Sequence, residues 1–118
     1  MSEKRYLVAV PIASLDRDGK ALPGDRVRES TERVQRELTR LFGGATVLPA
    51  PGSSAVVGGK TEPGQALVLS VCDDRDAFLA KRAEVRRLAE DVKAALDQET
   101  ALVLGFASDS LLVEDEAS

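Results

Sequence analysis

Four basic residues in the second half of the sequence recur at spacings that place them on one side of a helix. They are Arg75, Arg82, Arg86 and Lys93. At about 100° per residue, their directions around a helix fall within roughly 40° of each other. Such a stripe could bind a small anionic ligand or an acidic segment of a protein partner. It is also typical of a solvated helix flank whose charges pair with residues one turn away.

Aspartates form two further clusters that could hold a divalent metal ion through carboxylate oxygens. Asp16 and Asp18 follow an apolar segment, and Asp73 begins a second acidic run. A metal-dependent hydrolase or nuclease using Asp16, Asp18 and Asp73 is therefore one interpretation. The other is structural, because turns are polar and acidic side chains at a helix N-terminus complement the helix dipole.

Two other features invite a chemical interpretation. The segment Gly58-Gly59-Lys60-Thr61 resembles the end of a phosphate-binding loop, but Ser54 stands where that loop needs an earlier glycine, and a strand follows in place of a helix. We therefore predict a hairpin turn at the two glycines. Cys72 precedes a predicted helix N-terminus, which could activate a thiol. No resolving thiol or base accompanies it, so a buried structural thiol is expected.

The composition limits the available mechanisms. The 118 residues include one cysteine and no histidine, tryptophan or asparagine. Without histidine the chain has no Ser-His or Cys-His pair and no imidazole ligand for a metal. The net charge of −4 argues against binding to nucleic acid or to an anionic membrane. The single thiol suits a reducing cytoplasm, and the excess of arginine over lysine is typical of a GC-rich bacterial genome. We expect no cofactor, and binding rather than catalysis.

Apolar periodicity divides the chain into four strands and two helices. Strands are expected over residues 5–13, over 45–48 continuing at 55–57 after a break, over 65–72 and over 100–107. Helices are expected over 26–42, capped by Asp25, and over 75–97. The first of them should bury one stripe, because residues of low polarity repeat at spacings of four and three: Val27, Thr31, Val34, Leu38 and Leu41. The apolar run of the first strand is too short to cross a membrane.

The order β-α-β-β-α-β predicts an α+β fold of the ferredoxin-like type, a four-stranded antiparallel sheet in the order 4-1-3-2 with both helices on one face. We assign residues 1–108 to this single domain. The acidic tail at 109–118 is expected to form an extra strand or an arm that crosses to another subunit.

The predicted sheet has no cover on its second face, although its strands offer apolar side chains to both faces. A free monomer would expose a large apolar patch, and the second strand would add an apolar edge. We therefore expect a homo-oligomer, either a dimer or a trimer. The predicted interface residues are Val47, Leu48, Val56, Val57, Leu111 and Leu112.

The motifs FGGATVL at 42–48 and LDQETALVL at 96–104 resemble those of a group of small, uncharacterised microbial proteins. That group has an FGG-T motif after the first helix and a Q-E-apolar segment opening the last strand. The resemblance implies a fold without an assigned reaction. In architecture the chain is also similar to PII-type signalling trimers and to dimeric α/β-barrel proteins. The favoured function is a non-enzymatic oligomeric binding or scaffolding module, for PII-like sensing or for a protein partner. The metal-dependent enzyme is the alternative.

Overall fold

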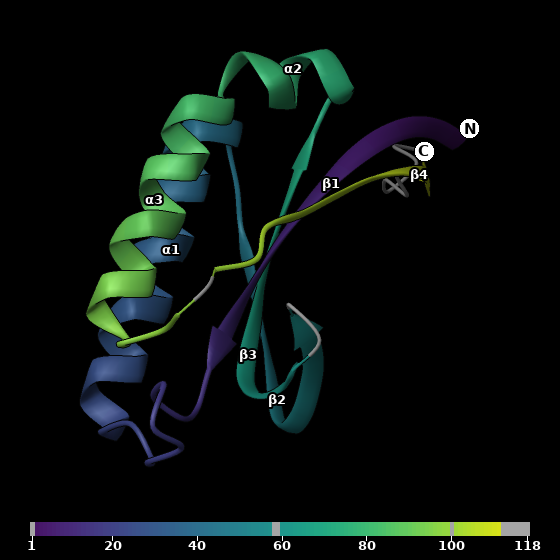
Figure 1. Cartoon of the computed structure of the whole chain (residues 1–118). Helices are drawn as coiled ribbons and strands as arrows, with labels where there is room; N and C mark the ends of the chain where they lie inside the picture. The colour runs from purple at the N-terminus through teal and green to yellow at the C-terminus, as the bar shows by residue number, and fades with distance from the viewer. Residues whose placement is uncertain (1, 58–59, 100, 112–118) are drawn as a thin grey trace, which may run out of the picture.

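The computed structural model describes residues 2–57, 60–99 and 101–111. Over these ranges the chain forms four strands and three helices (Figure 1). The strands are β1 (Ser2–Ala13), β2 (Thr46–Val57), β3 (Lys60–Cys72) and β4 (Leu104–Leu111). The helices are α1 (Gly24–Phe42), α2 (Arg75–Ala80) and α3 (Arg82–Ala95). Within the same ranges, none of the helices has the length and apolar character that a membrane span requires.

The four strands form one antiparallel sheet in the order β2-β3-β1-β4. β1 and β3 are central, with Val10 paired to Val68, and β4 pairs with β1 through Val8 and Gly105. Helices α1 and α3 lie together on one side of the sheet, and α2 runs across one end of it (Figure 1). The chain is therefore a small α+β fold in which helices cover only one sheet face.

The fold class predicted from the sequence needs correction. The predicted strand order 4-1-3-2 is the observed order β2-β3-β1-β4 read from the opposite edge, whereas the described chain has three helices in place of the two that were expected. The second helical segment is divided at Lys81, whose φ of −107° and ψ of 6° depart from helical values. The division lets α2 turn across the end of the sheet. Asp74 caps α2 by accepting the N–H of Ala77 at 2.8 Å.

Several predicted boundaries also shift. β2 continues through Pro49, where a break was expected, because it is an edge strand and its pairing with β3 shifts register between Pro49 and Ser53. β3 begins at Lys60, which pairs with Val57. The two glycines of the predicted hairpin turn lie outside the described residues. β4 begins at Leu104 and includes the first tail residues as far as Leu111.

The core lies between the sheet and the two long helices. The predicted apolar stripe of α1 is confirmed, because Val27, Val34 and Leu38 are buried against β1 and β3. α1 begins at Gly24, so the predicted cap Asp25 instead lies in its first turn. Ser70 is the polar member of the helix-facing side of β3, and its hydroxyl donates to the Gly44 carbonyl at 2.5 Å. This bond fixes the connection between α1 and β2 to the sheet.

Candidate functional site

A groove of about 440 Å³ opens on the helix side of the sheet, between α2 and α3 on one wall and the β1–β4 edge on the other. Phe78 of α2 and Val85 of α3 form the helical wall, and Tyr6 and Gly105 form part of the strand wall. The groove therefore joins residues about one hundred positions apart in the sequence. Pairing of β4 with β1 and the turn at Lys81 bring these two walls together.

Three arginines line this groove. Arg75, Arg82 and Arg86 were predicted to share one helical side, and the structure places all three around the same groove. Arg86 donates through Nε to the Glu90 carboxylate at 3.3 Å. In the part of the chain that the structure describes, the side chains of Arg75 and Arg82 form no hydrogen bond or ion pair. Two cationic groups are thus available to a ligand.

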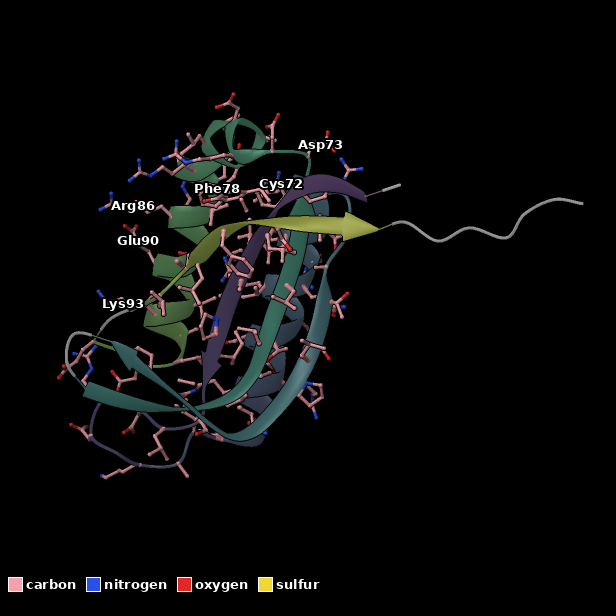
Figure 2. The ribbon with its side chains drawn as sticks, turned by 90° about the vertical axis from the view of Figure 1, so that its right-hand side faces the viewer. Cys72, Asp73, Phe78, Arg86, Glu90 and Lys93 are labelled. Atoms are coloured by element: carbon pink, nitrogen blue, oxygen red, sulfur yellow. The ribbon has the colours of Figure 1, made fainter. Side chains whose placement is uncertain are left out.

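The fourth predicted residue, Lys93, is not among the described lining residues of the groove. It lies farther along α3, on the same outward edge as Arg86 and Glu90 (Figure 2). The predicted stripe is therefore divided twice: the break at Lys81 places Arg75 on α2 and the other residues on α3, and the groove ends before Lys93.

Two aromatic rings form the base of the groove. The ring centroids of Tyr6 and Phe78 are 5.3 Å apart with an angle of 35° between the planes, which is a favourable aromatic pair. Gly105 lies beside Tyr6, and a Cβ atom at that position would come within 2.7 Å of the tyrosine hydroxyl. The sequence analysis did not identify this glycine. A glycine inside a strand pattern was the available signal, since it often marks a close approach.

The polar side chains of the groove, among the described lining residues, are the Tyr6 hydroxyl and three guanidinium groups. Guanidinium groups hold carboxylates and phosphates through paired hydrogen bonds. Aromatic and aliphatic side chains beneath them can hold an apolar, planar group.

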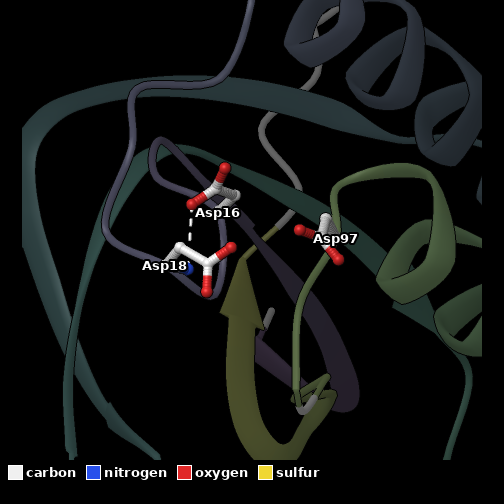
Figure 3. A group of neighbouring side chains, drawn as sticks. All are labelled: Asp16, Asp18 and Asp97. Atoms are coloured by element: carbon white, nitrogen blue, oxygen red, sulfur yellow. Dashed lines mark hydrogen bonds between the residues drawn. The ribbon is translucent and has the colours of Figure 1, made fainter.

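The predicted metal ligands do not come together as a set. Asp16 and Asp18 lie close to Asp97, with one oxygen of each within 4.8 Å of the others (Figure 3). Asp73 instead follows β3 near the other end of the sheet, 3.9 Å from Arg5. The sequence analysis missed Asp97, because its proximity depends on how the end of α3 meets the β1–α1 connection.

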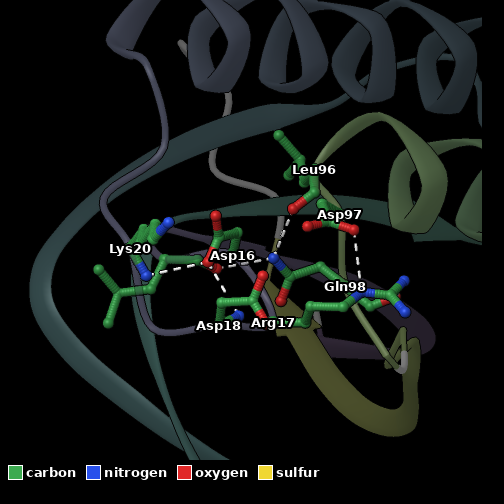
Figure 4. A network of polar contacts seen from close by, with 8 residues as sticks. Asp16, Arg17, Asp18, Lys20, Leu96, Asp97 and Gln98 are labelled. Atoms are coloured by element: carbon green, nitrogen blue, oxygen red, sulfur yellow. Dashed lines mark hydrogen bonds and ion pairs between the residues drawn. The ribbon is translucent and has the colours of Figure 1, made fainter.

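The aspartate cluster has a structural explanation (Figure 4). The Asp16 carboxylate accepts the backbone N–H groups of Asp18 and Lys20, both at 2.9 Å. Asp97 forms an ion pair with Arg17 at 2.9 Å, and its φ of 48° turns the chain at the end of α3. The Gln98 side chain continues the connection by donating to the Leu15 carbonyl at 2.7 Å. These contacts fix the β1–α1 connection to the end of α3.

Cys72 is a buried structural thiol, as predicted. Its side chain contacts the carbonyl oxygens of Tyr6 at 3.4 Å and Asp74 at 3.6 Å. Burial, followed by the charges of Asp74 and Asp73, raises the pKa of the thiol above its ordinary value of 9.0. The proton is therefore held more tightly than in an exposed cysteine, which is the opposite of activation.

The predicted interface residues fall into different environments. Val47 packs against the core cluster on the helix side of the sheet. Leu48 lies on the opposite face and is 44% exposed. The side chains of Val56, Val57 and Leu111, and the whole of Leu112, lie outside what the structure describes.

No family model and no curated protein sequence matches the chain. Among solved structures, a phage SAM lyase in complex with S-methyl-5′-thioadenosine is similar in fold, with a TM-score of 0.56 and 10% identity over 92% of this chain and 90% of that one. The divalent cation tolerance protein CutA1 from Thermus thermophilus is 19% identical over 98% of this chain and 88% of that one, with a TM-score of 0.43. At these identities the likeness concerns the fold alone.

Proposed function

We propose that the protein is a non-enzymatic, oligomeric binding module whose ligand is a small aromatic anion held in the arginine groove. The observation that carries this proposal is the juxtaposition of two unpaired guanidinium groups, Arg75 and Arg82 among the described residues, with the aromatic pair below them. A positive groove on a chain of net charge −4 is a local feature that the overall charge does not explain.

The groove supports a ligand with two chemical parts. A phosphate or carboxylate would accept paired hydrogen bonds from Arg75 and Arg82. A planar ring would lie against Tyr6 and Phe78, whose aromatic surfaces favour stacking. The volume of about 440 Å³ falls in the range of small-molecule sites. A nucleoside monophosphate has both parts at this size.

The metal-dependent alternative is less well supported. Its three predicted ligands are divided between two ends of the sheet, and the aspartates that do meet already bind backbone N–H groups and Arg17. No observation at that cluster favours a bound cation over the structural role.

A matched pair of ligands tests the binding proposal. AMP and S-methyl-5′-thioadenosine share the adenine base and the ribose ring, but only AMP carries a phosphate, where the other has a neutral methylthio group. Isothermal titration calorimetry at low salt should detect AMP and give much weaker binding, or none, for the neutral nucleoside. Rising salt should weaken AMP binding, because exposed charges are screened.

Matched variants locate the site. Arg75→Gln and Arg82→Gln should each weaken AMP binding by about 10- to 150-fold, since a hydrogen bond to a charged group contributes about 1.5–3 kcal/mol. Arg87→Gln is the control, because Arg87 is exposed on α3, the helix that carries Arg82, but is not among the described residues that line the groove. Equal effects of all three substitutions would indicate only a general charge effect. No AMP binding at millimolar concentration would refute the proposed ligand class.

A further inference from the structure

Among the described elements, none covers the sheet face opposite the helices (Figure 2). Of the five large hydrophobic side chains that are exposed among the described residues, four lie on this face: Leu48, Val71, Leu104 and Phe106, at 43–47% exposure. Their direction follows from strand alternation, because Val8, Val10 and Ile12 point to the helix side and the alternate residues point away.

Strand register makes these residues one continuous patch. Phe106, Leu7 and Val71 align across β4, β1 and β3 in one row. Leu104, Ala9 and Leu69 align in the next row. Ala9, in the middle of this second row, is only 2% exposed. A third row, which includes Leu48, extends the patch to β2.

The patch is large enough to bind a partner. Each row spans three strands about 4.8 Å apart, and three rows about 7 Å apart then cover roughly 300 Å². This is about the size of the largest apolar patch of a typical monomer, which is often functional. Two such faces together remove roughly 600 Å² from water, which is below the range of stable, specific interfaces. The size therefore predicts a weak, concentration-dependent complex.

We propose that this open face is the interface of a two-fold homodimer, with a second copy of the chain as its occupant. The patch is apolar in all three rows, so two copies with the same negative net charge meet there without opposing like charges. At one end of the patch, the row beyond Leu7 carries charges of opposite sign. Arg5 of β1 lies 3.9 Å from the carboxylate of Asp73, which directly follows β3.

That charged pair is complementary to itself under two-fold symmetry. Because β1 and β3 are the two central strands, a two-fold axis that runs along the strands between them exchanges their positions across the interface. Arg5 of each copy then faces Asp73 of the other. Sheets packed face to face with nearly aligned strands are a common arrangement, and a two-fold interface requires such self-complementarity. The arginine groove lies on the other side of the sheet and stays open.

Sedimentation velocity from micromolar to millimolar protein concentration tests the dimer. The full chain should pass from monomer to dimer in this range. Phe106→Glu, which introduces a charge into the patch, should weaken dimerisation at least tenfold. Leu79→Glu is the matched control, because Leu79 is 36% exposed but lies on α2 and lines the groove, and this variant should dimerise like the parent chain. Circular dichroism verifies that both variants are folded.

Charge exchange at the rim tests the symmetry. Arg5→Asp and Asp73→Arg should each weaken the dimer, and the double variant should recover at least part of the loss, because each new pair again joins opposite charges. A monomer at millimolar concentration, a trimer, or a dimer that Phe106→Glu leaves intact would overturn the proposal. The dimer rests on the oligomeric part of the proposed function, whereas AMP binding is measured in the groove on the opposite face, so dimerisation and ligand binding can each fail without the other.

Discussion

Replacing Gly105 by alanine should expose how closely β4 and Tyr6 meet at the base of the groove. The added Cβ would lie 2.7 Å from the Tyr6 hydroxyl, 2.8 Å from Cε1 and 3.1 Å from Cζ. Ordinary contact begins near 3.4 Å, so the ring must retreat by about 0.7 Å or more. Any such movement disturbs the contact between Tyr6 and Phe78, whose centroids are 5.3 Å apart.

Two opposing effects set the magnitude. Overpacking typically costs about 1–3 kcal/mol, while alanine in place of glycine inside a strand contributes about 0.5–1 kcal/mol in the favourable direction. Gly105→Ala should therefore lower the free energy of unfolding by roughly 0.5–2 kcal/mol. When Tyr6 is first replaced by alanine, the overlap disappears and only the favourable effect is left. The same substitution should then stabilise the protein by about 0.5–1 kcal/mol.

Urea unfolding followed by far-UV circular dichroism measures all four members of this cycle. The expected result is a change of sign between the two backgrounds. Near-UV circular dichroism gives a second readout, because Tyr6 is the single tyrosine of a chain without tryptophan. Gly24→Ala is the control, since a Cβ there would meet no atom within 4 Å. If Gly105→Ala had the same sign with and without Tyr6, the proposed close approach would be wrong.

Two further predictions concern stability. Leu38→Ala should lower the free energy of unfolding by about 2.7–5.0 kcal/mol, because Leu38 is fully buried. Leu41→Ala is the control: Leu41 lies one turn away and is only partly buried, so its replacement should cost less in the same urea titration. Equal losses would contradict the assigned core. Burial raises the pKa of the Cys72 thiol in the folded protein above 9.0. The contribution of the protonated thiol to the free energy of unfolding is therefore complete below pH 9.0 and should fall as the pH rises through the raised pKa. Unfolding midpoints across the alkaline range should therefore decline less steeply in Cys72→Ala, and an unchanged slope would refute this assignment.

The sequence anticipated features that depend on local periodicity. The α1 stripe and the shared side of Arg82 and Arg86 on α3 follow from helical spacing, and the buried thiol was inferred because no second thiol or base accompanies it. The break at Lys81 left no such signal, because Phe78 and Val85 are seven residues apart and keep the same apolar phase with or without it. The helix count was wrong for this reason.

Long-range pairing decided the sites themselves. The register of β4 against β1 places Gly105 beside Tyr6, and the end of α3 brings Asp97, rather than Asp73, to Asp16 and Asp18. Nearly continuous apolar runs in the strands indicated from the sequence alone that both sheet faces carry apolar side chains, from which a partner for one face was predicted. Only the tertiary structure decided which residues align on that face and that the arginine groove opens on the other face. The reason is that spacing along a chain fixes the direction of a side chain within its element, but not what another element places opposite it.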